Sequence, residues 1–277
     1  MRKILIRILV FAGFLLFFIA VLLYIQEFLF FHPWHDEASY NVLKENSHFT
    51  ELQIPHKDGT LHGWLRKNSH EEKAPLLLFF GGNGQNSSNT MQLFEAMDSF
   101  SYFENHHVLF VDYPGYGLSD GRPTETSLFS AALEFYDYGA QLDSVDPRRI
   151  SVLGYSIGTG VANYVAAQRD VSGLLLLDPY DKGLSLYNDV CNIFHGPIKY
   201  LARFEFDSQS YATQISVSPL IITSRDDEVI PSRLSLSLGE AFPNTSEIIV
   251  LEGISHDSYL YYGQVMEAIA SYLSALS

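Results

Sequence analysis

An 18-residue run without a charged side chain, Ile8 to Ile25, constrains this chain more than any other feature of its sequence. As a helix rising about 1.5 Å per residue, the run would match the hydrocarbon core of a bilayer. A cleaved signal peptide would have a shorter apolar stretch, followed by small residues at a cleavage site. A buried core helix would not need bases only at its start, as here with Arg2, Lys3 and Arg7. The run therefore predicts an uncleaved membrane anchor, in preference to these two alternatives.

The charges on either side of the run predict its orientation. The three bases precede it, whereas Asp36, Glu37 and Glu45 follow it. Because bases favour the cytoplasmic side, we expect a cytoplasmic N-terminus and an extracytoplasmic main domain, with the aromatic residues from Phe28 to Trp34 as a belt at the far interface. The expected organisation is a basic tip and transmembrane anchor over residues 1–31, a linker over 32–48 that is polar from about residue 35, and one catalytic domain over 49–277.

The rest of the chain is strongly acidic. Residues 32–277 contain 14 Lys and Arg against 31 Asp and Glu, a net charge of −17. A body of this charge repels polyphosphates and anionic lipid, so we expect no nucleic-acid partner. The single cysteine, Cys191, excludes a disulfide framework and any cysteine-rich metal site.

Strand-like and helix-like segments alternate along the acidic body. Two strand-like segments flank Asp58-Gly59, which is typical of a hairpin. Short apolar runs then alternate with stretches of helical spacing, which predicts an α/β fold with a mostly parallel sheet and helices on both faces. The expected strands are 49–55, 61–67, 76–80, 108–112, 150–153, 173–177, 220–223 and 247–251, and the expected helices are about 87–100, 124–141, 157–169 and 257–275. Residues 183–217 interrupt the alternation and predict a small cap at the strand ends.

The sharpest chemical signal is the G-x-S-x-G sequence at residues 154–158. It follows an apolar strand and opens a helical stretch, so it predicts a tight strand-to-helix turn with the hydroxyl of Ser156 above the sheet. The N-terminus of the following helix favours developing negative charge there. The alternative, an ordinary Gly/Ser turn, would need no partners for this serine.

A nucleophilic serine needs a base, and the base needs an orienting acid. His256 follows the last apolar strand, in a loop at the edge where sheet enzymes of this type assemble their sites. Two adjacent aspartates, Asp226 and Asp227, follow the preceding strand. We favour Asp227 as the acid, with Asp226 as the alternative and Asp178, at the end of an earlier strand, as a more distant one.

Backbone amides should stabilise the oxyanion. We expect the amide of Ile157, next to the nucleophile, and that of Asn83, in the glycine-rich loop after the first buried strand. The loop could instead cradle a phosphate, but it lacks the lysine and Ser/Thr of a P-loop and the G-x-G-x-x-G spacing. No cofactor is expected. The His32, His35 and Asp36 cluster has loose spacing, so we expect no metal site.

Residues 49–277 resemble the α/β-hydrolase family, and in particular a branch of serine hydrolases with an N-terminal membrane anchor. The resemblance rests on the loop Gly82-Asn83-Gly84-Gln85-Asn86, on the turn Asp112-Tyr113-Pro114-Gly115-Tyr116-Gly117-Leu118-Ser119, and on Asp227 before Val229-Ile230-Pro231. An Arg-Phe-Asp-Ser sequence often seen in the cap is only partly matched by Arg203 and Phe206-Asp207-Ser208. Many relatives also have His-Gly where this chain has Gly81-Gly82, which leaves open how side chains support the loop.

The resemblance implies an eight-stranded, mostly parallel α/β-hydrolase sheet and a two-step acyl transfer through Ser156, His256 and Asp227. The family includes carboxylesterases, lysophospholipases, depalmitoylases and peptidases, so the mechanism is better constrained than the substrate. The expected function is a membrane-anchored serine hydrolase of carboxylic esters or thioesters, with a small or lipid-like acyl substrate. The alternatives are a prolyl-type peptidase and a non-catalytic, membrane-tethered binding protein. The sequence assigns no substrate-binding residues.

Overall fold

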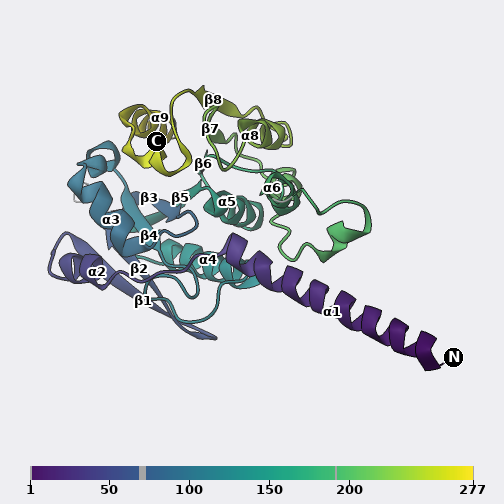
Figure 1. The fold of residues 1–277 in the computed structure, drawn as a ribbon. Helices are drawn as coiled ribbons and strands as arrows, with labels where there is room; N and C mark the ends of the chain where they lie inside the picture. The colour runs from purple at the N-terminus through teal and green to yellow at the C-terminus, as the bar shows by residue number, and fades with distance from the viewer. Residues whose placement is uncertain (1, 69–72, 191, 277) are drawn as a thin grey trace.

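The computed structural model describes residues 2–68, 73–190 and 192–276, so Cys191 lies outside the described residues. Its centre is one eight-stranded sheet in the order β1-β2-β4-β3-β5-β6-β7-β8 (Figure 1). The strands are β1 Phe49–His56, β2 Gly59–Arg66, β3 Ala74–Phe80, β4 His107–Val111, β5 Val145–Tyr155, β6 Gly173–Leu177, β7 Leu220–Ser224 and β8 Glu247–Leu251. The predicted eight-stranded sheet is confirmed, with β5 longer than its apolar run.

The sheet is antiparallel at one edge and parallel elsewhere. Strands β1 and β2 form the expected hairpin, and β2 also pairs antiparallel with β4. The remaining neighbours, from β4 through β3 to β8, all pair parallel. Every residue of β3 is buried, as a strand covered on both faces requires.

Helices cover both faces of the sheet, and the side chains of β3 alternate between two hydrophobic cores. Leu76, Leu78 and Phe80 join the core under helices α4 (Glu125–Ala140), α5 (Ile157–Gln168) and α8 (Ser232–Gly239). Leu77 and Phe79 join the core under α3 (Ser87–Ala96), the 3-10 helix η1 (Ser99–Phe103) and α9 (Gly263–Ala275). This alternation follows from the two-residue period of a strand.

The segment after the membrane run is more ordered than a polar linker. Helix α2 (Glu37–Lys44) forms there, capped by Asp36, whose side chain accepts from the amides of Ala38 and Ser39. Its Leu43 is buried in the core that contains α3. The sequence reading missed this helix because one buried leucine is too little apolar periodicity to reveal it.

The predicted interruption of the alternation is present. Between β6 and β7 lie α6 (Gly183–Val190), the 3-10 helix η2 (Gly196–Leu201) and α7 (Ser208–Ala212), and these short elements form the small cap. In Figure 1 the cap lies on the side of the body from which the first helix leaves.

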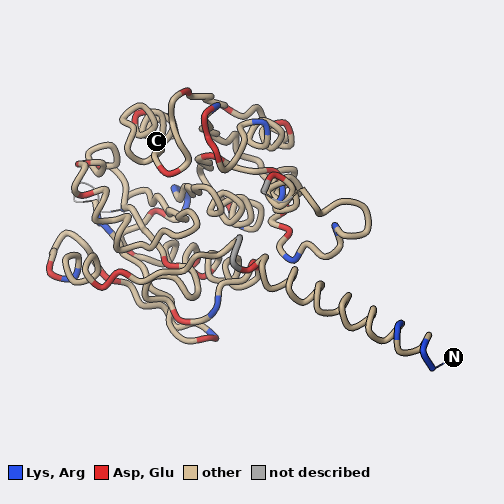
Figure 2. The backbone as a smooth tube through the Cα atoms, viewed as in Figure 1, with Lys and Arg blue, Asp and Glu red and all other residues tan. Residues whose placement is uncertain are grey.

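That first helix, α1 (Arg2–Phe30), projects from the body as one straight rod (Figure 1). Its stretch Arg2–Glu27 is long and apolar enough to cross a membrane. An 18-residue window within it has a mean hydropathy of 3.0, and 6% of that window is buried. Figure 2 shows bases at its free end, where Arg2, Lys3 and Arg7 lie.

The expected aromatic belt is wrong for the end of this helix. Phe30 and Phe31 are buried against the cap rather than free to face lipid, with the Phe30 ring 4.6 Å from that of Tyr187 and the Phe31 ring 4.9 Å from that of Phe204. Trp34 donates its indole N–H to the carbonyl of Gly84. An aromatic run that matches a membrane interface can equally supply the contacts by which a helix packs on its own domain.

Candidate active site

Ser156 lies on the turn between β5 and α5 with φ 54° and ψ −119°, a conformation that is strained for a residue with a side chain. A Cβ at Gly154 would lie 2.4 Å from the carbonyl oxygen of Gly158, and one at Gly158 would lie 2.1 Å from that of Phe80. Both glycines are therefore required by close backbone approach. The strand, the tight turn and the helix expected from the G-x-S-x-G sequence are all present.

The turn brings Ser156 to His256, as expected. The Oγ atom of Ser156 lies 2.9 Å from Nε2 of His256, and both residues are largely buried. His256 begins the 3-10 helix η3 (His256–Tyr261), directly after the loop that follows β8. The hydroxyl of Tyr155 donates to the backbone carbonyl of His256 and so ties the two loops together.

Two carboxylates meet the other nitrogen of this imidazole. Nδ1 of His256 lies 2.9 Å from Oδ2 of Asp227 and 3.0 Å from Oδ2 of Asp178. Asp226 is directed elsewhere, because its Oδ2 accepts from the amide of Gly253 at 2.6 Å. The structure thus places the favoured Asp227 at the imidazole, removes the alternative Asp226, and brings in Asp178, which the sequence had ranked last.

Each carboxylate is held by further donors. Oδ1 of Asp227 accepts from the amides of Val229 and Ile230, at 2.8 and 2.9 Å. Asp178 is fully buried with φ 51°, and its Oδ1 accepts from the hydroxyl of Thr223 at 3.1 Å. Both side chains are therefore fixed before any substrate binds.

Burial and mutual charge shift the pKa values of this cluster. Burial raises the pKa of Asp178 to about 7, although the hydrogen bond from His256 opposes the rise. Burial also acts to lower the pKa of His256, but the hydrogen bonds to Asp178 and Asp227 outweigh it and raise this pKa to about 10. Burial acts to raise the pKa of Asp227, yet hydrogen bonds from His256 and Asp178 bring it below its usual range. The three groups titrate as a coupled set, and Asp178 is the carboxyl that takes up a proton first.

The glycine-rich loop after β3 passes close to Ser156. A Cβ at Gly82 would lie 3.5 Å from that of Ser156. The amide of Gly82 donates to the side chain of Gln85 at 2.7 Å, so it is not free to bind an oxyanion. The amide of Asn83 donates to no acceptor among the described residues, and Ile157 starts α5, where an amide has no partner within the helix. The two amides expected to stabilise an oxyanion are thus both without an acceptor in the part of the chain described.

Two tyrosines of the 112–119 turn support this loop. The hydroxyl of Tyr113 donates to the carbonyl of Gly81, and that of Tyr116 to Oδ1 of Asn83, both at 2.9 Å. The same Oδ1 accepts from the amide of His32 at 2.7 Å. These contacts supply the side-chain support that the Gly81-Gly82 departure had left open.

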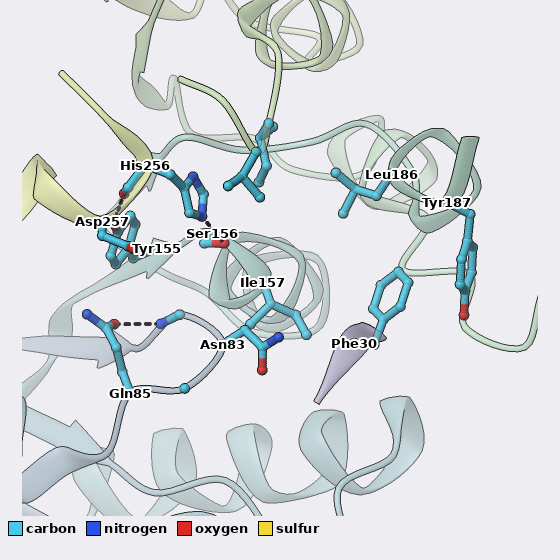
Figure 3. A pocket seen from close by; sticks show the side chains of 14 residues that line it. Phe30, Asn83, Gln85, Tyr155, Ser156, Ile157, Leu186, Tyr187, His256 and Asp257 are labelled. Carbon is cyan, nitrogen blue, oxygen red and sulfur yellow. Dashed lines mark hydrogen bonds between the residues drawn. The ribbon is translucent and has the colours of Figure 1, made fainter. Parts of the chain in front are cut away.

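A cavity of about 370 Å³ opens above Ser156 (Figure 3). One wall is apolar and reaches the cap, with Phe30 of α1 beside Leu186 and Tyr187. His256 and Asp257 lie on the opposite side. Its full lining is Phe30, Gly82, Asn83, Gly84, Gln85, Tyr155, Ser156, Ile157, Leu186, Tyr187, Val229, Ile230, His256 and Asp257.

The sequence reading missed two residues of the site, Phe30 and Gln85, for different reasons. Phe30 continues the apolar run of the predicted membrane helix, and nothing local shows that this end of the helix packs on the cap. Gln85 accepts from the amide of Gly82, three residues before it, but nothing in the loop sequence marks a glutamine as the acceptor. The contact of Phe30 with Tyr187, by contrast, joins segments far apart in the sequence, and such contacts leave no periodicity that a single sequence can reveal.

The cluster His32, His35 and Asp36 does not converge on a point. Nδ1 of His32 bonds the side chain of Asn83, Nδ1 of His35 bonds the carbonyl of Gly117, and Asp36 caps α2. Among the described residues, the group whose ligand atoms lie within 4.8 Å of one another is Asp178, Asp227 and His256. In that group Nδ1 is within hydrogen-bond distance of both carboxylates.

Comparison with known families agrees with this geometry. A model of the alpha/beta hydrolase family matches residues 77–231, which is more than half of the chain and includes Ser156 and Asp227. The chain belongs to the α/β-hydrolase family. In this hydrolase, the fold of the family consists of the eight-stranded sheet, the tight turn that carries Ser156 between β5 and α5, and the cap between β6 and β7.

Two relatives of this α/β hydrolase have similar sequences. An uncharacterized protein of Mycobacterium tuberculosis strain H37Rv is 28% identical over 229 residues, which are 81% of this chain and 79% of the relative. Human alpha/beta hydrolase domain-containing protein 17C is 26% identical over 198 residues, which are 72% of this chain and 57% of the relative. The hydrolase described here therefore corresponds to little more than half of the human protein.

Solved esterase structures share the fold. An esterase of Pyrococcus furiosus superposes with a TM-score of 0.67 at 14% identity, covering 89% of this chain and 97% of its own. An acetyl xylan esterase from Paenibacillus sp. R4 gives a TM-score of 0.63 at 16% identity, covering 90% and 98%. At such identities the likeness shows the architecture and leaves the substrate open.

Proposed function

We propose that this α/β hydrolase is a membrane-anchored serine hydrolase that cleaves neutral carboxylic esters or thioesters through an acyl-enzyme. The observation that carries the proposal is the 2.9 Å contact between Oγ of Ser156, on a strained turn, and Nε2 of His256, at the base of a cavity with two unoccupied amide donors.

Acylation begins when neutral His256 takes the proton of Ser156 as Oγ attacks the carbonyl carbon. The carbonyl π electrons move to its oxygen, which the amides of Asn83 and Ile157 stabilise. Asp227 fixes the imidazole tautomer through Nδ1 and stabilises the imidazolium. The tetrahedral intermediate then expels the alkoxide or thiolate leaving group, which takes the proton from His256.

Deacylation repeats these steps with water. His256 removes a proton from the water as its oxygen attacks the acyl carbon, and it returns that proton to Oγ of Ser156 as the ester bond breaks. The carboxylic acid leaves and the resting hydroxyl is restored. The reaction consumes water and substrate alone, so the proposal needs no cofactor.

The cavity supports a small or medium-sized apolar acyl group. About 370 Å³ is near the lower end of ligand-sized pockets. The wall formed by Phe30, Ile157 and Leu186 is apolar, whereas Asp257 brings negative charge to the opposite side. Substrates with an anionic leaving group are therefore disfavoured at that side of the cavity, and the net charge of −15 on the whole protein repels them as well.

The test of this function is a labelling and hydrolysis experiment on the full chain. A fluorophosphonate probe should label the parent and not Ser156→Ala, and this variant should lose on the order of 10⁴–10⁶ in turnover of p-nitrophenyl esters. Equal hydrolysis by parent and variant would refute the assignment. A chelator should leave the parent rate unchanged, because no step uses a metal.

The same substrate panel separates the two alternatives. Aminoacyl amides cleaved faster than esters would favour a peptidase of prolyl type. A chain that neither binds the probe nor turns over any acyl substrate would be a tethered binding protein, for which Asp227 and His256 would have no use.

We also propose that α1 is an uncleaved single-pass anchor with a cytoplasmic N-terminus, which places the hydrolase domain outside. Arg2, Lys3 and Arg7 at the free end of α1 support this orientation. The packing of Phe30 in the cavity wall supports retention of the helix, because cleavage after this residue would remove part of the site. Protease added to sealed spheroplasts should therefore digest the domain and spare a reporter fused to the N-terminus.

A further inference from the structure

The cap carries an exposed apolar tip, residues 192–202. Ile193 and Ile198 are each about two-fifths exposed, and Tyr200 is 80% exposed. Residues 192–202 contain Lys199 and no Asp or Glu, in a protein that is acidic elsewhere. Exposed aliphatic and aromatic side chains beside a base are typical of segments at a membrane interface.

The tip lies beside α1 at the end of its membrane-spanning stretch. Nε2 of Gln26 donates to the carbonyl of Leu201 at 3.0 Å, and the amide of Arg203 donates to Oε1 of Gln26 at 2.7 Å. Gln26 directly follows the uncharged run Ile8–Ile25. The apolar tip is therefore held at the level where α1 leaves the hydrocarbon.

Protein atoms cover α1 even further toward its N-terminus. Leu22 is 7% exposed and belongs to the hydrophobic core that contains Phe30 and Tyr187. It precedes Gln26 by one helical turn, about 6 Å at 1.5 Å per residue. If the uncharged run occupies the bilayer, some of the domain must enter it as well, because Leu22 lies within that run.

Ion pairs fix the domain at this depth. Glu27 pairs with Arg203 of the cap at 2.9 Å and with Arg122, which follows the 112–119 turn, at 2.5 Å. The Arg122 side chain is 71% exposed, so it presents a cationic group where α1 meets the body. Phospholipid phosphates would lie at the same level, so the charges complement one another. Figure 1 shows the tip and α1 leaving the body on the same side.

We propose that the cap tip, residues 192–202, is a membrane-docking surface whose partner is the phospholipid bilayer that contains α1. With the tip in the interface, the cap wall of the cavity adjoins the bilayer surface. The hydrolase is then suited to amphiphilic acyl esters that reside in the membrane. This inference rests on the proposed anchor and on the proposed hydrolase function.

The test measures how deeply a labelled residue lies in the bilayer. The full chain, carrying a fluorescent dye at one position, is placed in phosphatidylcholine vesicles, and some of the lipids carry a nitroxide quencher on the acyl chain. In a Cys191→Ser background, the dye is attached to Tyr200→Cys, to Phe14→Cys in α1, or to Val42→Cys in α2. Phe14 and Val42 are both exposed, so each accepts the label without loss of packing. Position 14 reports the anchor, and position 42 reports a part of the domain away from α1 (Figure 1).

We expect the nitroxide lipid to quench the dye at position 200 several-fold more than at position 42, and aqueous iodide to show the reverse. Lipid quenching at position 14 but not at 200 would overturn the docking surface and leave the anchor intact. Shielding of position 200 from both quenchers would indicate a second copy or another protein as the occupant, and would also overturn the proposal. Absence of lipid quenching at position 14 would instead refute the anchor.

Activity gives an independent readout of the same surface. Ile198→Asp with Tyr200→Asp places two charges on the tip and touches none of the residues assigned to catalysis. The double variant should hydrolyse a vesicle-borne monoacylglycerol several-fold more slowly than the parent and a soluble p-nitrophenyl ester at the parent rate. Equal rates of the double variant and the parent on the vesicle substrate would count against the docking surface. The hydrolase function is tested separately by Ser156→Ala, whose loss of both activities does not depend on where the tip lies.

Discussion

The carboxylate of Asp178, at the end of β6, lies 3.0 Å from Nδ1 of His256, the same ring nitrogen that Asp227 approaches from the loop after β7. Two acids on one imidazole nitrogen give His256 a second acceptor when either acid is lost. The arrangement is built into the fold, because Asp178 is fully buried and adopts a positive φ of 51°.

The first prediction concerns this shared nitrogen. The double variant Asp178→Asn, Asp227→Asn should lose about 10⁴ in kcat, because neither amide can fix the productive tautomer. Each single variant should lose much less, since the remaining carboxylate still accepts from Nδ1. Steady-state kinetics on a soluble ester measures this, with thermal unfolding to show that each variant is folded. If Asp227→Asn alone is as slow as the double variant, Asp178 does not act as an acceptor.

The second prediction is the pH dependence. His256 acts as a base when neutral, and its pKa is raised to about 10, so kcat/KM should rise with pH along a limb displaced above the ordinary histidine value of 6.5. The carboxylate of Asp178 contributes to that rise. Asp178→Asn should therefore move the limb to lower pH, most clearly above pH 7, where Asp178 of the parent is ionised. A limb that stays in place or moves to higher pH would contradict the assigned coupling.

The third prediction concerns the anchor helix as part of the cavity. Phe30 lines the cavity and its ring lies 4.6 Å from that of Tyr187. Phe30→Ala should enlarge the apolar end and shift the preferred p-nitrophenyl ester toward longer acyl chains, with Phe30→Leu in between. Each profile is normalised to its own best substrate, so that loss of folded protein does not affect it. Phe14→Ala, on the exposed part of α1, is the matched control and should keep the parent profile.

The fourth prediction concerns the glycine after the nucleophile. In Gly158→Ala, the new Cβ would lie 2.1 Å from the carbonyl oxygen of Phe80 and 2.6 Å from that of Gly81, where the glycine-rich loop begins. We expect a loss of stability of about 1–3 kcal/mol or more, together with a loss of activity as the loop is displaced. Gly13→Ala is the control, because a Cβ there meets nothing within 4 Å. Equal melting temperatures for the two variants would show that the close approach is absent.

Part of the fold and of the candidate site could be predicted from local patterns in the sequence. The apolar run of β3, the G-x-S-x-G turn around Ser156 and the position of His256 after the last strand each depend on neighbours in the sequence. Parallel strands bring their carboxyl ends to one edge of the sheet, so the meeting of Ser156, Asp227 and His256 follows from strand order. The length and hydropathy of α1 likewise follow from composition alone.

Other features depended on contacts across the fold. Asp226 and Asp227 are adjacent in sequence, and only the path of the loop after β7 directs Asp227 to His256 and Asp226 to Gly253. The burial of Phe30 against the cap could not be predicted, because a phenylalanine at the end of an apolar helix gives the same sequence pattern whether it contacts lipid or protein. The sequence by itself determined which groups could react and roughly where along the chain they lie. Only the tertiary structure decided which acids share the imidazole and what forms the cavity wall, since both depend on short-range distances between segments that the chain keeps far apart.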